Sequence, residues 1–295
     1  GQPVCGRAGS SWNVAEPFFP KERLIILGGG HVALPVAEFG ARVGFLVTVV
    51  DDRLSFANPG RFPMAEKVIC DDFGHAIEEL KIQESDYICI VTRGHRHDAD
   101  CLRMIGKGKE PAYLGMIGSR RRVGIVKQEL LEEGYDPERM SRLKSPIGLK
   151  IGGVTPEEIA ISILAEIIQV KRMDREDKRV KNRSDLDFDV LKRLAEEPDE
   201  PKAVVTVIES KGSSPRGAGA KMIVYRDGRI LGSIGGGCSE AAVLGEARSL
   251  IGSGRYKVVH VDLTGEAAED EGMVCGGIMD VLVEDFATDR EPGDR

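Results

Sequence analysis

The sequence predicts an α/β protein with a doubly wound, Rossmann-type parallel sheet, followed by a second, smaller α+β domain. Residues 23–28 (RLIILG) contain four consecutive apolar residues, as a strand buried on both faces requires. A glycine turn and a helix-like segment follow, and the next apolar run, at 46–52, ends in two aspartates. Strand-like and helix-like segments then continue to alternate, which is typical of a parallel sheet with helices on both faces.

The domain boundaries follow from changes in this pattern. The helix-like segment 155–172 closes the first domain, and Thr155, Pro156 and Glu158 form a capping-box pattern at its start. A stretch dense in charge comes next, followed by a short helix, a predicted hairpin, a helix after a glycine turn, and two more strands. We expect an N-terminal arm at 1–20, a Rossmann-type nucleotide-binding domain at 21–172, a charged linker at 173–187, a cysteine-bearing α+β domain at 188–288 and a tail at 289–295.

The composition limits the partners. The formal net charge of −7 at pH 7 disfavours nucleic acid as a general partner. No apolar run reaches the ~18 residues that a membrane span needs, and residues 1–14 lack the apolar core of a signal peptide. The six cysteines show neither a CxxC pair nor zinc-binding spacing. We therefore expect a cytoplasmic protein that binds neither nucleic acid nor membrane.

The first glycine turn, GGGHVA at 28–33, fits the G-x-G-x-x-A pattern between a buried strand and a helix. Its glycines permit a tight turn and close approach to a pyrophosphate, and the helix N terminus supplies free N–H groups. An aspartate at the end of the second strand can accept hydrogen bonds from ribose hydroxyls and repels a 2′-phosphate, so NAD is favoured over NADP. The alternative is a turn that only connects strand to helix. The candidate binding residues are Gly28, Gly29, Gly30, His31, Asp51 and Asp52.

Two further segments end predicted strands of the same sheet, TRGHRHD at 92–98 and GSRRR at 118–122. Ligands of open α/β sheets bind outside the carboxyl ends of the strands, so both segments are expected at that edge. Arginines at a helix start suit a phosphate, although a solvated basic face explains them equally well. The His-x-His pair is more typical of polar loop chemistry than of a metal site, which needs three or four ligands. The candidate residues are Thr92, Arg93, Gly94, His95, Ser119 and Arg120.

A second glycine turn, at 235–237, lies between a predicted strand and a helix, and Cys238 follows it directly. A thiolate at a helix N terminus is stabilised by the helix dipole and by free N–H groups. Cys238 is therefore a candidate nucleophile, sulfur carrier or metal ligand, with a buried structural thiol as the alternative. Glu240 can either cap the helix or act as a catalytic acid–base group.

Two other segments of the second domain carry candidate ligands. Cys275 lies in a CGG cluster and can bring a second thiol near the first; two soft thiolates suit molybdenum, copper or iron–sulfur chemistry better than hard cations. The SSPRG turn at 213–217 offers hydroxyls, backbone donors and a guanidinium to an oxyanion, although an ordinary Gly/Ser/Pro turn explains it as well. The candidates for cofactor binding in this domain are Ser214, Arg216, Gly235, Gly236 and Gly237.

Together these motifs resemble the xanthine dehydrogenase accessory factors, the XdhC/CoxI family. The resemblance covers most of the chain from about residue 16, and its long motifs are far more specific than G-x-G-x-x-A alone. The segments similar to the cysteine-bearing domain of that family are 212–222, 232–243 and 275–277. The segments similar to its Rossmann domain are 26–33, 49–63, 115–122 and 145–167.

The order of the two domains departs from the family, which usually places the cysteine-bearing domain first. MDVLVEDF at 279–286 resembles WNVAEPFF at 12–19, the segment that leads into the Rossmann strand. A fusion of repeated copies, followed by loss of the outer parts, would leave this reversed order. An exchange of domains between two copies of the chain would restore the usual contacts; this is a hypothesis.

Members of this family act in the maturation of molybdenum hydroxylases. The resemblance implies an accessory protein or chaperone rather than a turnover enzyme. Such a protein binds the molybdenum cofactor (molybdopterin or its dinucleotide form), protects it during sulfuration and delivers it to an apo molybdenum hydroxylase of the xanthine dehydrogenase type. A cysteine desulfurase and a second copy of the chain, forming a homodimer, are the other implied partners. Cys238 and Cys275 would hold the molybdenum or pass sulfur, and the glycine turns with Arg216 would hold the pterin phosphate or its nucleotide extension.

Two other function classes stay open from the residues alone. An NAD-dependent oxidoreductase would use the first glycine turn, with His95 or Cys238 as the acid–base or nucleophilic group. It would reduce NAD in the presence of purines or aldehydes. A nucleotide-sensing binding module would keep the turn without chemistry, and Cys238→Ala would then leave its function intact.

Overall fold

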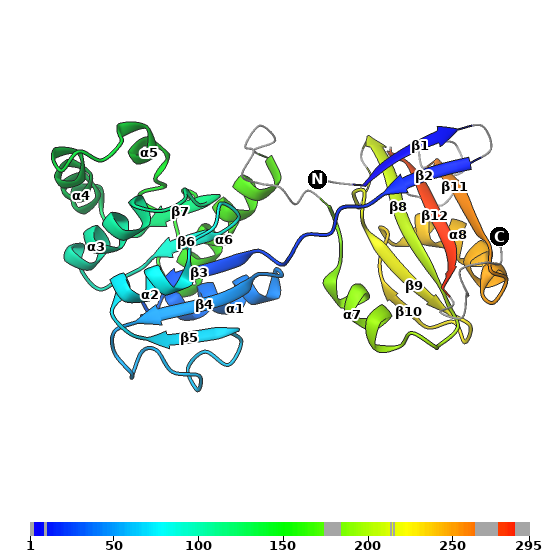
Figure 1. Cartoon of the computed structure of the whole chain (residues 1–295), viewed down its shortest axis with the longest axis horizontal. Helices are drawn as coiled ribbons and strands as arrows, with labels where there is room; N and C mark the ends of the chain where they lie inside the picture. Colours follow the sequence, from blue (N-terminus) through cyan, green and yellow to red (C-terminus); the bar gives the residue numbers. More distant parts are fainter. Residues whose placement is uncertain are drawn as a thin grey trace. The chain divides into compact units, whose positions relative to one another are not determined.

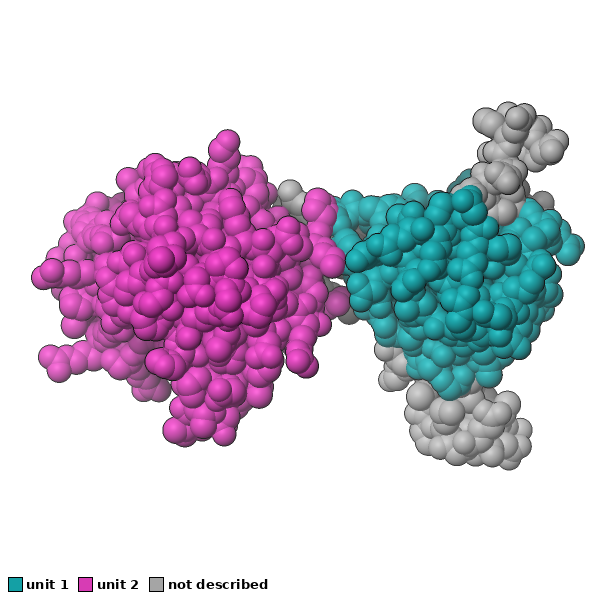
Figure 2. Space-filling model, turned by 90° about the horizontal axis from the view of Figure 1, so that it is seen from below, with its two compact units in different colours: residues 1–19, 182–295 teal, residues 20–181 magenta. Residues whose placement is uncertain are grey.

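The computed structural model divides the chain into two compact units (Figure 2). Residues 20–181 form one, which we call the Rossmann unit. Residues 1–19 together with 182–295 form the other, which we call the antiparallel unit. The structure describes residues 3–8, 11–173, 184–212, 214, 216–262 and 277–286, with the backbone alone at 7, 8, 11, 12 and 238.

A five-stranded parallel sheet forms the centre of the Rossmann unit, in the order β5-β4-β3-β6-β7 (Figure 1). Its strands are β3 (Arg23–Leu27), β4 (Leu46–Asp51), β5 (Lys67–Cys70), β6 (Tyr87–Ile90) and β7 (Tyr113–Met116). The chain builds β4 and β5 on one side of β3 and then returns to build β6 and β7 on the other side. The segments that follow β3 and β6 therefore diverge, which is the switch point of a doubly wound sheet. The predicted fold class is confirmed for this unit.

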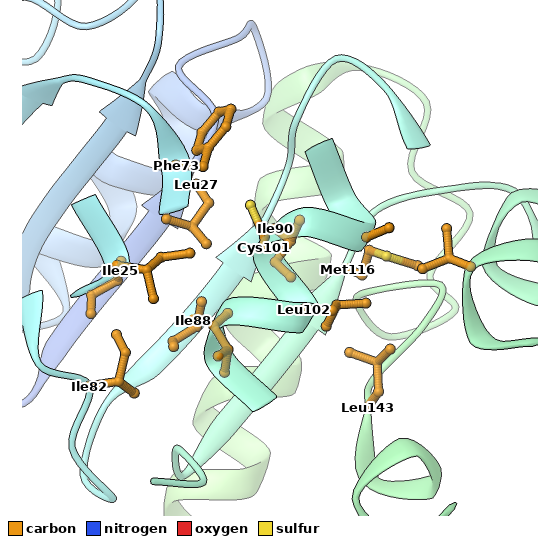
Figure 3. Close-up of a cluster of buried hydrophobic side chains, with 14 of the residues drawn as sticks. Ile25, Leu27, Phe73, Ile82, Ile88, Ile90, Cys101, Leu102, Met116 and Leu143 are labelled. Atoms are coloured by element: carbon orange, nitrogen blue, oxygen red, sulfur yellow. The ribbon is translucent and has the colours of Figure 1, made fainter. Parts of the chain in front are cut away.

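Helices cover both faces of this sheet, because successive residues of its buried strands point to opposite sides. Leu24 and Ile26 lie in the core beneath α1 and α6, whereas Ile25 and Leu27 lie in the core on the other face (Figure 3). The helices of the first face are α1 (Ala33–Arg42) and α6 (Pro156–Met173). Those of the second face are α2 (Phe73–Leu80), α3 (His95–Gly106), α4 (Arg120–Glu132) and α5 (Pro137–Arg142).

Two helices of this unit, α4 and α6, begin with a side-chain cap. The Ser119 hydroxyl accepts a hydrogen bond from the Arg122 N–H at the start of α4. At the start of α6, the Thr155 hydroxyl accepts from the Glu158 N–H, and the Glu158 carboxylate accepts from the Thr155 N–H at 3.1 Å. The predicted capping box is therefore confirmed. Among the described residues, no helix combines the length and the apolar character that crossing a bilayer demands.

The antiparallel unit contains a second five-stranded sheet, in the order β10-β9-β8-β12-β11 (Figure 1). Its strands are β8 (Lys202–Gly212), β9 (Lys221–Tyr225), β10 (Ile230–Gly232), β11 (Tyr256–Asp262) and β12 (Gly277–Phe286). Helix α8 (Gly237–Leu250) contributes Val243 and Ala247 to the main core, and α7 (Phe188–Glu196) packs through Val190 against β9. This arrangement is the smaller α+β domain that the sequence predicts.

The first residues of the chain belong to the antiparallel unit. Strands β1 (Val4–Ala8) and β2 (Ser11–Ala15) form a hairpin beside β8 (Figure 1). The buried ammonium group of Lys221 donates to the Glu16 carboxylate at 2.7 Å and to the Thr206 hydroxyl at 2.9 Å. The segment expected as an arm at 1–20 therefore contains a hairpin that an ion pair ties to β9.

The stretch expected as a charged linker at 173–187 is divided between the units. Met173 is the last residue of α6, and residues 174–183 lie outside the described part of the chain. The Asp185 carboxylate accepts hydrogen bonds from the Arg216 guanidinium at 2.7 Å and from the Gly217 N–H at 3.0 Å. The end of this stretch is thus anchored in the antiparallel unit. The expected tail at 289–295 lies outside the described residues.

Candidate functional site

The candidate residues of the Rossmann unit gather at one edge of its sheet. Residues 28–31 follow β3, Asp51 ends β4, residues 91–95 follow β6 and residues 117–120 follow β7. These strands are parallel, so the four segments lie at the same edge, which we call the carboxyl edge. The segments after β3 and β6 flank the switch point, where open α/β sheets bind ligands.

The first glycine turn is shaped by close backbone contacts. A Cβ atom added to Gly28, whose φ is +112°, would lie 2.5 Å from the Val91 carbonyl oxygen. One added to Gly29 would lie 2.3 Å from the Phe56 carbonyl oxygen. One added to Gly30 would meet nothing within 4 Å. The first two glycines are therefore required by the packing of the protein itself, whereas the backbone at Gly30 is open to a ligand.

The buried carboxylate of Asp51 fixes this turn. It accepts hydrogen bonds from the Gly29 N–H at 2.8 Å, and from the Arg53 backbone N–H, Nε and Nη2 at 3.1, 2.8 and 3.0 Å. A carboxylate offers about four lone-pair positions. Asp51 has none left for a ribose hydroxyl in this conformation, so its role here is to hold the glycine turn and Arg53 together.

Arg61 and Phe56 are part of the edge that the motifs alone did not single out. The Arg61 guanidinium donates to the Gly29 carbonyl at 3.2 Å and to the Gly30 carbonyl at 3.3 Å. The Arg53 guanidinium lies 3.8 Å from the centre of the Phe56 ring. The segment after β4 thus folds back onto the turn. Its only signal in the sequence is the run SFANPGRFP, which contributed to the family resemblance.

Asp52 and Arg93 form an ion pair between the segments after β4 and β6. The Arg93 Nη2 lies 2.8 Å from Asp52 Oδ2, and a second guanidinium nitrogen contacts Oδ1. The hydrogen bond from Arg93 lowers the pKa of Asp52 from its usual 3.8 to about 2, against an opposing effect of burial. Asp52 is therefore a carboxylate at neutral pH, paired with Arg93, which the sequence predicted as a cofactor-binding residue.

A buried carboxylate positions the segment after β6. Asp98, which is fully buried, accepts a hydrogen bond from the Thr92 hydroxyl at 2.6 Å and from Nε of Arg122 at 2.8 Å. Burial raises the pKa of Asp98, while the bonds from Thr92 and Arg122 act in the opposite direction. Thr92 therefore serves to hold its loop against α4. Arg122 was not singled out from the sequence, because only the fold shows which arginine of the RRR run turns inward.

The helix N termini at this edge favour anions. Among the described residues, no side chain caps α1 or α3, whose first residues are Ala33 and His95. Uncapped N termini present free N–H groups and partial positive charge. His31, His95 and Arg120 are exposed there. No group of three or more metal-ligating side chains converges within the part of the chain that the structure describes.

The second glycine turn has an unusual backbone and a local set of hydrogen bonds. Gly235, Gly236 and Gly237 have φ values of +133°, +71° and +54°, which side-chain-bearing residues rarely adopt. The Glu240 Oε1 atom accepts from the Ser233 hydroxyl at 2.7 Å and from the Gly236 N–H at 3.0 Å. Glu240 therefore fixes the turn, which favours the capping role over the acid–base role. Ser233 was not singled out from the sequence.

The remaining candidates of the antiparallel unit are placed as follows. Cys238 is the second residue of α8, and Cys275 lies outside the described residues. The Ser214 hydroxyl donates to the Arg216 carbonyl at 2.7 Å, and the Arg216 guanidinium is engaged by Asp185. Arg216 thus has a structural partner on the segment that precedes α7.

Two protein-family models match the chain. Residues 24–167 match the XdhC Rossmann domain, and residues 195–262 match the XdhC and CoxI family; together the matches cover more than two thirds of the chain. The chain belongs to the XdhC and CoxI family. The two matches stand in the order found from the sequence, with the Rossmann domain first.

Several curated proteins are similar to this chain. It is 37% identical over 168 residues to the uncharacterized protein YqeB of Escherichia coli (strain K12), covering 57% of this chain and 30% of that protein. It is 34% identical over 153 residues to a probable xanthine dehydrogenase subunit of Bacillus subtilis (strain 168), with coverages of 52% and 44%. It is 40% identical over 74 residues to the molybdenum cofactor insertion chaperone PaoD of E. coli (strain K12), with coverages of 25% and 23%.

The chain spans less than half the length of each of these curated relatives. Among solved structures, it is similar to a xanthine dehydrogenase from Bacillus halodurans. The identity is 34% and the TM-score is 0.47, with 58% of this chain and 47% of that chain covered.

Proposed function

We propose that the protein is an accessory factor for a molybdenum hydroxylase: it receives the molybdenum cofactor as cargo, holds it during sulfuration and passes it to the apo-enzyme. The observation that carries the proposal is the position of Cys238, the second residue of α8, directly after the turn that Glu240 fixes. The relatives support this class of function, since one is named a molybdenum cofactor insertion chaperone and another a probable subunit of xanthine dehydrogenase.

The second glycine turn would hold the metal end of the cargo. The N-cap residue of α8, Gly236, has no side chain that could occupy the N–H groups of the first turn, and a helix N terminus is an environment that stabilises a thiolate. A thiolate is a soft ligand and can also accept a sulfur atom, so the same group serves metal binding and sulfuration. The glycines that precede it leave the backbone accessible to a bulky ligand.

The carboxyl edge of the Rossmann unit, considered by itself, would suit a phosphate or a nucleotide. Two uncapped helix N termini lie there, together with Arg61, Arg93 and Arg120. Guanidinium groups and helix N termini are the usual phosphate ligands of proteins. The open space at Gly30 leaves room for the phosphate to approach the backbone.

The arrangement gives less support to NAD-dependent hydride transfer. Of the two aspartates expected to accept the ribose hydroxyls, Asp51 has its lone pairs filled by Gly29 and Arg53. Asp52 is paired with Arg93. The edge therefore favours the phosphate part of a ligand over its ribose, and a cofactor-handling role fits better than a dehydrogenase.

The proposal is tested by replacing the thiol. We expect Cys238→Ala, produced together with the partner hydroxylase in the host, to abolish hydroxylase activation and to reduce the molybdopterin that co-purifies, measured as its fluorescent oxidation product. Cys70→Ala removes an exposed thiol from the other unit and serves as the control. Full activation and full molybdopterin content with Cys238→Ala would contradict the proposal.

The carboxyl edge is tested by ligand titration. We expect pyrophosphate to bind the native protein and Arg93→Met to weaken that binding about 10-fold, because one charge-assisted contact is lost. Arg103→Met, which removes an arginine paired on the outer surface of α3, is the control. NAD that binds far more tightly than pyrophosphate, with sensitivity to Asp51→Asn, would instead support the dinucleotide alternative.

A further inference from the structure

A cavity of about 140 Å³ lies in the Rossmann unit beside the start of β7, at the opposite end of the strands from the carboxyl edge. Two residues of its wall, Leu102 and Leu143, are drawn in Figure 3. Protein interiors contain few voids larger than a water molecule, and an engineered apolar cavity of roughly 150 Å³ binds benzene. The space beside β7 therefore has room for one ring-sized ligand. Its buried apolar wall consists of Leu102, Ile105, Pro111, Ala112, Met140 and Leu143.

Hydrogen bonds fix the elements that surround the cavity. Arg139 of α5 donates to the carbonyl of Gly106 at 2.8 Å and to that of Gly108 at 3.2 Å. Arg142 donates to the two carboxylate oxygens of Glu110 at 2.6 and 2.8 Å. These bonds tie α5 to the segment between α3 and β7, and the cavity lies in the space between them. Helix α5 could fill this space only by breaking them, so the cavity is a fixed part of the unit.

The interior of the cavity offers aromatic and apolar surface. Tyr113 and Tyr135 both line it. The Tyr113 hydroxyl donates to the Glu166 carboxylate at 2.6 Å, and the Tyr135 hydroxyl donates to the Arg103 carbonyl at 2.8 Å. Since both hydroxyls are already used, the two tyrosines present their rings to a ligand. Aromatic rings pack favourably against one another, and the interior therefore favours an aromatic ligand over a polar one.

The rim of the cavity is positively charged. Arg139, Arg142, Lys144 and Glu110 line it, which leaves a formal excess of two positive charges. Arg142 is paired with Glu110. Lys144 is exposed, and its ammonium group has no partner among the residues that the structure describes. A cation beside an apolar space suits a ligand that joins a ring to one negative group.

We propose that this cavity is a binding site for a small aromatic carboxylate, with the ring in the apolar interior and the carboxylate at the Lys144 ammonium group. A free phosphate has no apolar part to occupy the interior, and a neutral ring has nothing to pair with Lys144. The residues that line the cavity are all outside the carboxyl edge, where the phosphate of the cargo is expected. This inference does not depend on the proposed function.

The first test titrates the full chain, labelled with nitrogen-15, with benzoate and records the chemical shifts of its amide groups. We expect saturable changes centred on residues 110–114 and 140–144. Benzyl alcohol, a neutral molecule of similar size, should bind about 10-fold more weakly, because it lacks the charge that pairs with Lys144. The absence of saturable changes with benzoate, or changes centred on residues 28–31 and 91–95, would overturn the proposal.

The second test changes the charge at the rim. Lys144→Met should weaken benzoate binding about 10-fold and leave benzyl alcohol binding unchanged, because only the carboxylate uses the ammonium group. Lys144→Arg should keep most of the affinity for benzoate. Lys150→Met is the matched control, because Lys150 is also exposed and lies outside the cavity. An equal loss for both ligands in Lys144→Met, or no loss for either, would show that Lys144 does not hold the carboxylate and would overturn the proposal.

The third test fills the cavity. Val170 of α6 is partly buried and lines the cavity, so Val170→Phe should abolish benzoate binding. Its midpoint of urea unfolding should stay at the native value, because the added atoms enter empty space. Ile167→Phe is the comparison: Ile167 lies one turn earlier on α6 and is fully buried in the core, so the larger side chain should lower the midpoint. Benzoate binding that persists in Val170→Phe, with a native circular dichroism spectrum, would overturn the proposal.

Discussion

The two glycine turns of this chain are alike in sequence but are held in different ways. In the first, Gly28 and Gly29 lie against the carbonyls of Val91 and Phe56, and Asp51 and Arg61 reach the turn from other segments. The second turn, at 235–237, is fixed by Ser233 and Glu240 next to it in the chain. The first turn needs glycine for space and the second needs glycine for conformation, so the two should respond differently to the same kind of substitution.

The largest effect is expected at the first turn. Gly29→Ala places a Cβ atom 2.3 Å from a backbone oxygen, which cannot move alone, so the Rossmann unit should lose roughly 3 kcal/mol or more of its free energy of unfolding. Gly30→Ala, in the same turn but in open space, should stay within about 0.5 kcal/mol of the native protein. Urea unfolding followed by circular dichroism measures both.

The single tryptophan provides an internal control for this comparison. Trp12 belongs to strand β2 of the antiparallel unit, so its fluorescence follows the other unit. We expect the fluorescence transition to be unchanged in both variants. Equal destabilisation by Gly29→Ala and Gly30→Ala would mean that contact with Phe56 does not decide the need for glycine.

The next effect concerns the carboxylate that fixes the first turn. Asp51→Asn keeps an acceptor for the Gly29 N–H but turns an amide group toward the Arg53 guanidinium, so the Rossmann unit should lose about 2 kcal/mol of its free energy of unfolding. The double variant Asp51→Asn, Arg53→Met should recover part of this loss, because it also removes the unpaired cation. A double variant that is less stable than the single one by the full cost of Arg53→Met would exclude coupling between the two residues.

The same comparison of the two turns shows which parts of the candidate site the sequence predicts. The glycine turns, Asp51 and the capping residues Ser119 and Thr155 were predictable, because each depends on neighbours close in the chain. The contact of Arg61 with the carbonyl of Gly29 was not, because it joins segments that only the fold brings together. The sequence could also place Asp51 correctly without showing that its lone pairs are already filled.

The N-terminal hairpin was missed for a similar reason. Residues 1–20 show little periodicity, and their pairing partner Lys221 lies in the other half of the sequence. A buried ion pair between distant segments leaves no local pattern. The charged stretch at 173–187 was read from its composition, which gives no sign that Asp185 binds Arg216.

At the second turn the expected effect is smaller and has a different cause. Gly236→Ala meets nothing within 4 Å, but its φ of +71° and ψ of +176° belong to a region nearly restricted to glycine, so we expect a loss of about 1–2 kcal/mol from the antiparallel unit. Tryptophan fluorescence during urea unfolding measures this loss. Recovery with D-alanine at position 236, introduced by semisynthesis, would identify conformation as the cause; no recovery would exclude it.

Two substitutions of Glu240 distinguish a structural role of this residue from a catalytic role. Glu240→Gln retains an oxygen that can accept from Ser233 and Gly236, so stability should fall by only about 0.5–1 kcal/mol. If Glu240 only positions the turn, hydroxylase activation should persist in this variant and be lost in Glu240→Ala. Loss of activation in Glu240→Gln with unchanged stability would instead indicate a proton-transfer role.

The smallest effect is expected from the ion pair between Asp52 and Arg93, which joins the segments after β4 and β6. Arg93 lowers the pKa of Asp52 from 3.8 to about 2, so the pair stabilises the fold above pH 4 and this contribution is lost as the pH falls toward 2. The side chains of Asp52 and Arg93 are 28% and 42% exposed, and solvent screening therefore limits the contribution to about 0.5–1 kcal/mol. Native protein and Arg93→Met should thus differ in stability at pH 7 and converge as the pH approaches 2, and 0.5 M salt should reduce the difference at pH 7. A difference that persists unchanged at pH 2 would show that Arg93 stabilises the edge through packing.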